Sequence, residues 1–216
     1  MALAKMSFDE LNRLVGYKKS EPINEYFTPM RISETAKRRR EQLAYELEQI
    51  FLAMLIELFY ADQYDVSVNQ GDLVNRMLIE YMAIVGSIDG IEPDDYIESH
   101  AEAIITSVLE VLFRHQSEPY YYSRDRARLI GEDESNAVWG HQELMDAIAD
   151  GYTMKKWNTI MDGRERESHA ELNGTTIPID EPFEARGGLM MEPHDDSLGV
   201  DDDELVNCRC SLSFSK

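Results

Sequence analysis

Apolar residues recur at spacings of three and four along the first half of the chain, and this period constrains the fold more than any other feature. The first apolar stripe consists of Leu43, Leu47, Ile50, Phe51, Met54, Leu55 and Leu58. This spacing places the side chains on one face of an α-helix. A long amphipathic helix is therefore predicted from about Ser33 to Tyr60. A shorter amphipathic turn is predicted at residues 8–15.

Two further stripes of the same period follow. The second consists of Leu73, Val74, Met77, Leu78, Tyr81 and Val85. The third consists of Ile97, Ala101, Ile104, Ile105, Val108, Leu109 and Leu112. Pro93 is expected at the first position of the third helix, with Asp94 and Asp95 in its first turn. Three apolar faces of this kind can bury one another, so a small helical bundle is predicted.

The pattern changes after the aromatic segment Gln116–Ser123. One more helix is predicted from about Ser123 to Asp150, and Gly151 is expected to end it. The remaining expected elements are short and mixed: a strand at Met154–Ile160, a helix at Arg164–Asn173, a strand at Thr175–Ile179 and a turn at Gly187-Gly188.

The last predicted element is a strand with one buried face. Its apolar positions are Val206, Cys208, Cys210, Leu212 and Phe214, and they alternate strictly with polar residues. The predicted fold class is therefore α+β. Residues 1–118 form a helical region that we expect to bind partners. Residues 119–216 form a compact domain with a small, mainly antiparallel sheet, which we expect to fold alone.

The charge of the chain limits its partners. The formal net charge is −21, and it is uneven: residues 1–50 carry nine basic and eight acidic side chains, whereas the remainder carries 12 and 34. An acidic surface repels phosphate backbones, so tight generic binding to nucleic acid is disfavoured. The longest apolar run, Ile50–Ile56, is far shorter than the roughly 20 residues that span a bilayer, so no membrane contact is expected.

One local exception to the acidic balance is a run of four basic residues, Lys37, Arg38, Arg39 and Arg40. Such a run can face DNA or an acidic partner. It can equally be an ordinary solvated turn of helix, and this second interpretation is favoured because isolated basic clusters are common.

The chain has two cysteines, Cys208 and Cys210. On a strand their Cα atoms would lie roughly 6.5–7 Å apart, at the limit of what a disulfide can bridge. They are therefore interpreted as free thiols or metal ligands, in keeping with a reducing cytoplasm. The first alternative is a pair of buried, inert thiols, because the neighbours on the same face of the strand are apolar.

The second alternative is a zinc site. Cys208, Cys210 and His169 would supply three ligands. The fourth would come from one of three residues: Asp162, Asp180 or His194. The C-x-C spacing differs from the C-x-x-C spacing of common zinc folds, so the buried-thiol interpretation is favoured.

A catalytic site is a further hypothesis. Asp162, Arg164, Arg166 and His169 lie in one short stretch and resemble a phosphodiester-cleaving set, with His169 as general base and an arginine on the phosphate. This would make the protein a nucleic-acid-processing or toxin-like enzyme. No second histidine or glutamate stands at a diagnostic spacing. A structural ion-pair network, with Asp162 capping the following helix, is favoured instead.

The C-terminal half resembles a known family. The residues that carry the resemblance, in order, are Glu134, Ser135, Gly151, Lys156, Trp157, Thr159, Asp162, Gly163, Arg164, Glu165, Arg166, Ser168, His169, Leu172, Asn173, Gly174, Asp180, Pro182, Phe183, Pro193, Asn207, Cys208, Arg209 and Cys210. Their order and spacing, over roughly residues 123–216, are similar to those of the phage head morphogenesis family of minor head proteins like the F protein of phage Mu. His194 stands where a glycine is common in that family.

The resemblance implies a structural protein of a tailed bacteriophage or prophage. From the residues discussed above, no enzymatic activity is expected, and no cofactor other than the zinc alternative. It implies a role in head assembly, DNA packaging or ejection, in the host cytoplasm during assembly and then in the head interior or at the portal vertex. The implied partners are the portal protein and the major capsid or scaffolding protein. Contact with packaged DNA is considered only for the basic run itself, Lys37, Arg38, Arg39 and Arg40. The motif residues are Trp157, Asp162, Arg164, Arg166, His169, Gly174, Asp180, Pro193, Asn207, Cys208, Arg209 and Cys210.

Overall fold

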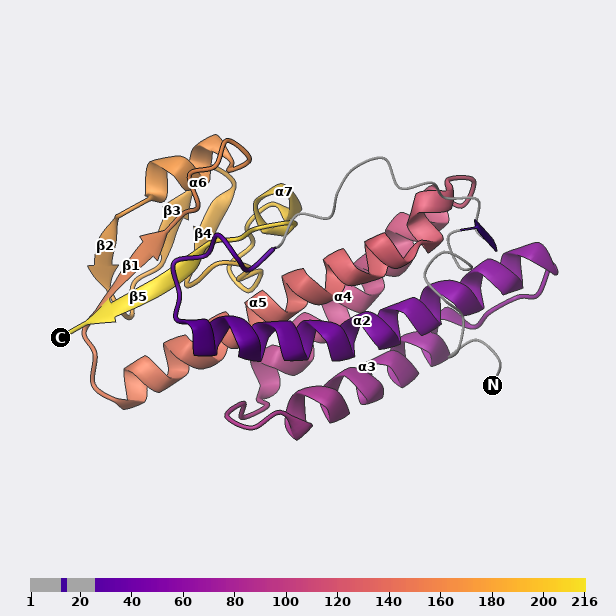
Figure 1. The fold of residues 1–216 in the computed structure, drawn as a ribbon, viewed down its shortest axis with the longest axis horizontal. Coiled ribbons are helices and arrows are strands. Elements are labelled where there is room, and N and C mark those ends of the chain that lie inside the picture. The colour runs from indigo at the N-terminus through magenta and orange to yellow at the C-terminus, as the bar shows by residue number, and fades with distance from the viewer. Residues whose placement is uncertain (1–12, 15–25) are drawn as a thin grey trace. The chain divides into compact units, whose positions relative to one another are not determined.

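The structure is a computed structural model that describes residues 13–14 and 26–216 (Figure 1). The longer helices are α2 (Glu34–Gln63), α3 (Gln70–Ser87), α4 (Asp95–Arg114) and α5 (Arg124–Ala149), with a 3₁₀ turn, η2 (Pro119–Tyr122), before α5. The remaining elements are β1 (Met154–Asn158), α6 (Glu167–Leu172), β2 (Thr176–Pro178), β3 (Phe183–Ala185), β4 (Gly188–Met190), α7 (Asp202–Leu205) and β5 (Ser211–Ser215). The predicted α+β class is confirmed. The turn predicted at residues 8–15 lies almost entirely outside the described residues.

The chain divides into two compact units that are not consecutive in sequence. Among the described residues, the first comprises Gln42–Glu132 with residues 13–14, and the second comprises residues 26–41 and Asp133–Lys216. The division falls inside α2 and inside α5, so each of these helices contributes residues to both units.

The first unit is built on the three predicted stripes. Its buried residues include Leu43, Leu47, Phe51, Met54, Leu55, Leu73, Met77, Tyr81, Val85, Ile97, Ala101, Ile105, Val108, Leu109 and Leu112. Helix α4 begins at Asp95 because the Asp94 side chain accepts a hydrogen bond from the Ile97 N–H at 2.9 Å. Pro93 therefore precedes the cap, and its expected place at the first helical position is wrong.

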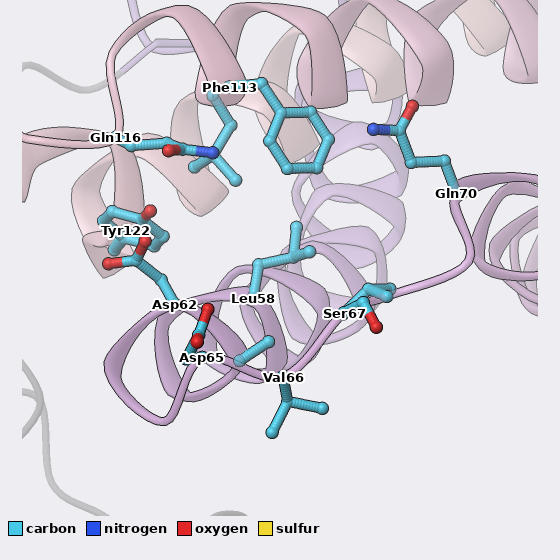
Figure 2. Close-up of a pocket in the computed structure, with 12 residues that line it drawn as sticks. Leu58, Asp62, Asp65, Val66, Ser67, Gln70, Phe113, Gln116 and Tyr122 are labelled. Atoms are coloured by element: carbon cyan, nitrogen blue, oxygen red, sulfur yellow. The ribbon is translucent and has the colours of Figure 1, made fainter.

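The first unit also contains a hollow of about 450 Å³, lined by residues from α2, α4, η2 and the segment between α2 and α3. Figure 2 shows Leu58 and Phe113 directed into it, with Asp62 and Asp65 along one side.

No helix in the described part of the chain combines the length and the apolar character needed to cross a membrane.

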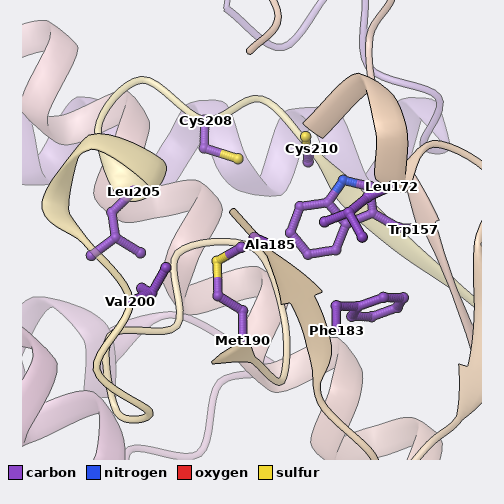
Figure 3. Close-up of a cluster of buried hydrophobic side chains, with 9 residues drawn as sticks. All are labelled: Trp157, Leu172, Phe183, Ala185, Met190, Val200, Leu205, Cys208 and Cys210. Carbon is purple, nitrogen blue, oxygen red and sulfur yellow. The ribbon is translucent and has the colours of Figure 1, made fainter. Parts of the chain in front are cut away.

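The second unit contains two small antiparallel sheets. In the larger sheet β1 lies between β2 and β5, with Trp157 opposite Leu212. Strands β3 and β4 form a hairpin in which Phe183 faces Met190. The apolar core of the unit consists of Trp157, Leu172, Phe183, Ala185, Met190, Val200, Leu205, Cys208 and Cys210 (Figure 3). The two cysteines enter this core from the segment that leads into β5.

Two predicted elements are shorter than expected. The terminal strand begins at Ser211, because the backbone turns at Asn207 with φ 59° and Val206 is 52% exposed. The helix predicted from Arg164 begins at Glu167, and Asp162 does not cap it. Instead, Asp162 accepts a hydrogen bond from the Arg164 N–H at 3.2 Å in the turn before the helix.

Candidate functional site

The terminal segment Asn207–Cys210 is held by hydrogen bonds from distant parts of the second unit. The Asn207 N–H donates to Asp133 Oδ2 at 2.7 Å. The Cys208 carbonyl accepts from the Tyr26 hydroxyl at 2.5 Å and lies 2.7 Å from His194 Nε2. The backbone amide and carbonyls of a buried segment need partners, so these contacts fix its path independently of any sheet.

Asn136, on α5, is the second anchor of this segment. Its Nδ2 donates to the Cys208 carbonyl at 3.3 Å and to the Cys210 carbonyl at 3.1 Å. Its Oδ1 accepts from Arg40 Nε at 3.1 Å, which fixes the orientation of the amide. A single buried amide therefore ties α2, α5 and the terminal segment together within the second unit.

The thiols of Cys208 and Cys210 meet one imidazole. Each Sγ lies 3.5 Å from His169 Nδ1, and the three atoms all lie within 4.8 Å of one another. All three residues are at most 4% exposed. Burial raises the pKa of the Cys208 thiol, whereas a hydrogen bond from Cys208 lowers the pKa of Cys210.

The opposite side of the His169 ring faces a carboxylate. Nε2 lies 3.0 Å from Glu204 Oε2, and the Ser168 hydroxyl donates to the same oxygen at 2.7 Å. The His169 carbonyl accepts from the Thr159 hydroxyl at 2.6 Å, and Trp157 Nε1 donates to Thr159 Oγ1 at 3.1 Å. The imidazole therefore lies between the two thiols and the Glu204 carboxylate, although its Nε2 makes no well-directed hydrogen bond.

An ion-pair network covers the outer side of the same segment. Arg209 makes two contacts of 2.9 Å with the carboxylate of Asp162, and Arg164 Nη2 donates to it at 2.9 Å. Hydrogen bonds from Arg209, and then from Arg164, hold the pKa of the Asp162 carboxyl well below its usual range. Arg166 donates to the Val206 carbonyl. The motif thus forms a network between the turn before α6 and the terminal segment.

These contacts do not assemble the hypothetical catalytic set. Arg164, Arg166 and His169 line one small pocket, but its volume of about 20 Å³ holds no more than a water molecule. Sites for small organic ligands measure roughly 300–1,000 Å³. The Asp162 carboxylate is bound by two arginines, and His169 is 2% exposed.

The remaining motif residues have separate positions. Gly174 adopts φ 86°, and its N–H donates to the Trp157 carbonyl at 2.8 Å, so this glycine closes the turn against β1. Pro193 is buried and Asp180 is exposed. Among the described residues, Asp162, Asp180 and His194 do not join the group formed by the two thiols and His169, so none of them is placed as the fourth ligand.

The basic run Lys37–Arg40 is not one exposed patch. Arg40 is 1% exposed, and its guanidinium pairs with both oxygens of Glu143 at 2.8 and 2.9 Å. The guanidinium of Arg39 lies 5.4 Å from the centre of the Trp139 ring. Contact of Arg40 with DNA, considered for the basic run in the sequence, is therefore wrong, because this side chain forms part of the interior of the second unit.

Several residues of the site were not predicted from the sequence. They are Tyr26, Arg40, Asp133, Asn136 and Glu204. The available signal was the polar run in the middle of α5, where Glu134, Ser135 and Asn136 are all buried. Polar side chains on the buried side of a long helix indicate a specific hydrogen-bond network.

Asp133 gives the site a pH dependence. Burial raises the pKa of its carboxyl from 3.8 to about 7, against the hydrogen bonds from Tyr26 and Asn207. The unfolded chain loses this proton near pH 4, whereas the folded chain keeps it until about pH 7. The free energy of unfolding is therefore expected to fall as the pH rises across this window and to level off above it.

The variant Asp133→Asn is expected to show a smaller fall between pH 4 and pH 7 than the wild type, since asparagine does not titrate. Urea unfolding at a series of pH values measures this difference. The same slope in both proteins would show that the native Asp133 carboxyl is already ionised at pH 5.

Comparison with known protein families covers the residues of this site. A family described as "Phage Mu protein F like protein" matches residues 95–213, which is more than half of the chain and includes the whole terminal segment. The protein therefore belongs to this family of bacteriophage head morphogenesis proteins.

The chain is also similar to an individual bacteriophage protein. The chain is 32% identical over 93 residues to "Minor head protein GP7" of Bacillus phage SPP1, a match that covers 41% of this chain and 29% of the relative. The chain thus covers less than a third of the length of that relative. No solved structure gives a significant match.

Proposed function

We propose that this protein is a minor head protein that acts during head assembly and remains in the virion, in the head interior or at the portal vertex. The observation that carries the proposal is the family match over residues 95–213. The printed name of the SPP1 relative, a minor head protein, supports it. The buried motif is consistent with a structural part, because its polar groups are used in holding the fold.

The proposed partners are the portal protein and the major capsid or scaffolding protein. The helical region, residues 1–118, is proposed as the partner-binding part. In its described residues, large apolar side chains are exposed at Tyr45, Tyr64, Val66 and Ile79, each at 57% or more. These side chains are candidate contact residues, and tyrosine is enriched in surfaces that bind other proteins. Contact with packaged DNA is proposed only for Lys37, Arg38 and Arg39, because Arg40 is buried.

A nucleic-acid-processing enzyme is the weaker alternative. The pocket beside His169 has a volume of about 20 Å³, and the acidic chain repels a phosphate backbone. We therefore propose that the protein binds other head proteins and catalyses no reaction. The proposed location also suits a role in DNA packaging or ejection.

The proposal predicts that peptides of this protein occur in purified phage heads, in far fewer copies than the major capsid protein. Quantitative mass spectrometry of heads from a density gradient measures the ratio. Repeated absence from heads whose capsid peptides are abundant would contradict a virion role.

The location is tested with heads assembled without portal protein. Loss of this protein from such heads is expected if it is attached at the portal vertex. Retention at the same copy number would place it elsewhere in the head.

A further inference from the structure

Cys208 and Cys210 are arranged around a single nitrogen of the His169 ring. Both thiols lie 3.5 Å from the same Nδ1 atom. A ring nitrogen has either one hydrogen or one lone pair, so it can serve one thiol at a time. The two sulfur atoms and the ring nitrogen all lie within 4.8 Å of one another, which is close enough for them to bind one metal ion.

The spacing fits a tetrahedral zinc ion. With Zn–S bonds of about 2.3 Å and a Zn–N bond of about 2.0 Å, neighbouring sulfur and nitrogen ligands lie about 3.5 Å apart. Two thiolates and an imidazole are the ligands that this ion prefers. We propose that Cys208, Cys210 and His169 bind one Zn²⁺ ion. The sequence alone favoured inert thiols because the C-x-C spacing is unusual. The fold adds the observation that the two thiols and His169 Nδ1 lie close together.

The surroundings of His169 match those of a metal ligand. A histidine that binds zinc usually directs its other nitrogen to a carboxylate. Here Nδ1 faces the thiols, while Nε2 lies 3.0 Å from Glu204 Oε2. The Ser168 hydroxyl holds that carboxylate oxygen at 2.7 Å. With its hydrogen on Nε2, toward Glu204, the ring would present the Nδ1 lone pair to the metal.

The fourth corner of the tetrahedron has room for water. His169, Cys208 and Cys210 together line the pocket of about 20 Å³, which is enough for one water molecule. The arginines that also line it are engaged, since Arg164 and Arg209 bind Asp162 and Arg166 donates to Val206. Two thiolates neutralise the charge of the ion, and their protons leave to solvent on binding.

The ion would join α6 to the segment that leads into β5, and so close the core of the second unit. The three ligands come together only in the folded chain, so binding of the ion would stabilise the folded state. The proposal does not depend on the role in the phage head. Absence of metal would leave the head-protein proposal intact, and absence from heads would leave the metal site intact.

The test is elemental analysis of the full-length protein, purified in reducing buffer without chelator. About one zinc per chain is expected for the wild type, and less than about a tenth of that for Cys208→Ser or Cys210→Ser. The matched control is His141→Gln, which alters a different buried histidine of the same unit, whose Nδ1 lies 2.7 Å from Glu192 Oε1. This control is expected to keep the metal.

A second measurement keeps the test valid if the cysteine variants do not fold. Titration of metal-free wild type with Co²⁺ is expected to give the absorption of tetrahedral cobalt with thiolate ligands, and Glu204→Gln is expected to weaken binding by about 10–100-fold. Wild-type protein that carries no zinc, binds no Co²⁺ and keeps its unfolding temperature with a chelator would overturn the proposal in favour of buried thiols.

Discussion

Gly131→Ala is expected to lower the free energy of unfolding by about 3 kcal/mol, the upper end of the usual cost of overpacking. Gly131 lies in α5 where that helix approaches α2 in the first unit. A Cβ atom there would lie 2.6 Å from the Ala44 carbonyl oxygen and 2.8 Å from the Glu48 nitrogen. Both are backbone atoms, so they cannot rotate away, and the two helices must separate. Urea unfolding followed by circular dichroism measures the loss.

Gly140 provides a matched control in the same helix. A Cβ atom at Gly140 would meet nothing within 4 Å. Alanine stabilises a helix interior by up to about 1 kcal/mol relative to glycine, so Gly140→Ala is expected to leave the protein equally or more stable. Equal destabilisation by both substitutions would contradict the close approach of the two helices at Gly131.

The long helices could be predicted because their periodic pattern is repeated over many turns. The helix predicted from Ser33 to Tyr60 extends from Glu34 to Gln63, and the helix predicted from Ser123 to Asp150 extends from Arg124 to Ala149. Each apolar position adds independent evidence for the same face, so single exceptions do not alter the result.

The short elements were harder to predict because distant contacts decide them. Alternation from Val206 to Phe214 predicts a strand, but only the part from Ser211 pairs with β1. Before it, Asp133 and Asn136 hold the backbone by hydrogen bonds that replace those of a sheet. Nothing in the five alternating residues distinguishes these two sources of partners.

Only some residues of the candidate site could be identified from the sequence. The resemblance identified Trp157, His169 and the terminal segment, and the structure places them together. Tyr26 was not identified, because it lies 182 positions from Cys208 in sequence and precedes a helix assigned to the other region. The unit boundary inside α2 is also invisible in the apolar period, which continues unchanged through it.

The burial of Arg40 was also not predictable from the sequence, and substitution of this residue is expected to lower the stability of the protein considerably. In sequence it is the last of four consecutive basic residues, which favours a solvated surface. In the structure its planar guanidinium holds Glu143 with two parallel contacts and also reaches Asn136, the residue that anchors the terminal segment. Because the side chain is 1% exposed, these bonds have little competition from water.

Arg40→Ala is therefore expected to lower the free energy of unfolding by about 3 kcal/mol, since breaking a buried ion pair costs roughly 3–5 kcal/mol and Glu143 can regain some hydration. Arg40→Lys keeps the charge but loses the two-pronged contact, so an intermediate loss is expected. The control is Arg38→Ala, at an exposed position of the same run, with an expected change within about 0.5 kcal/mol. Chemical unfolding compares the three variants. Equal, small effects at both arginines would mean that Arg40 lies at the surface, and its contact with DNA would again have to be considered.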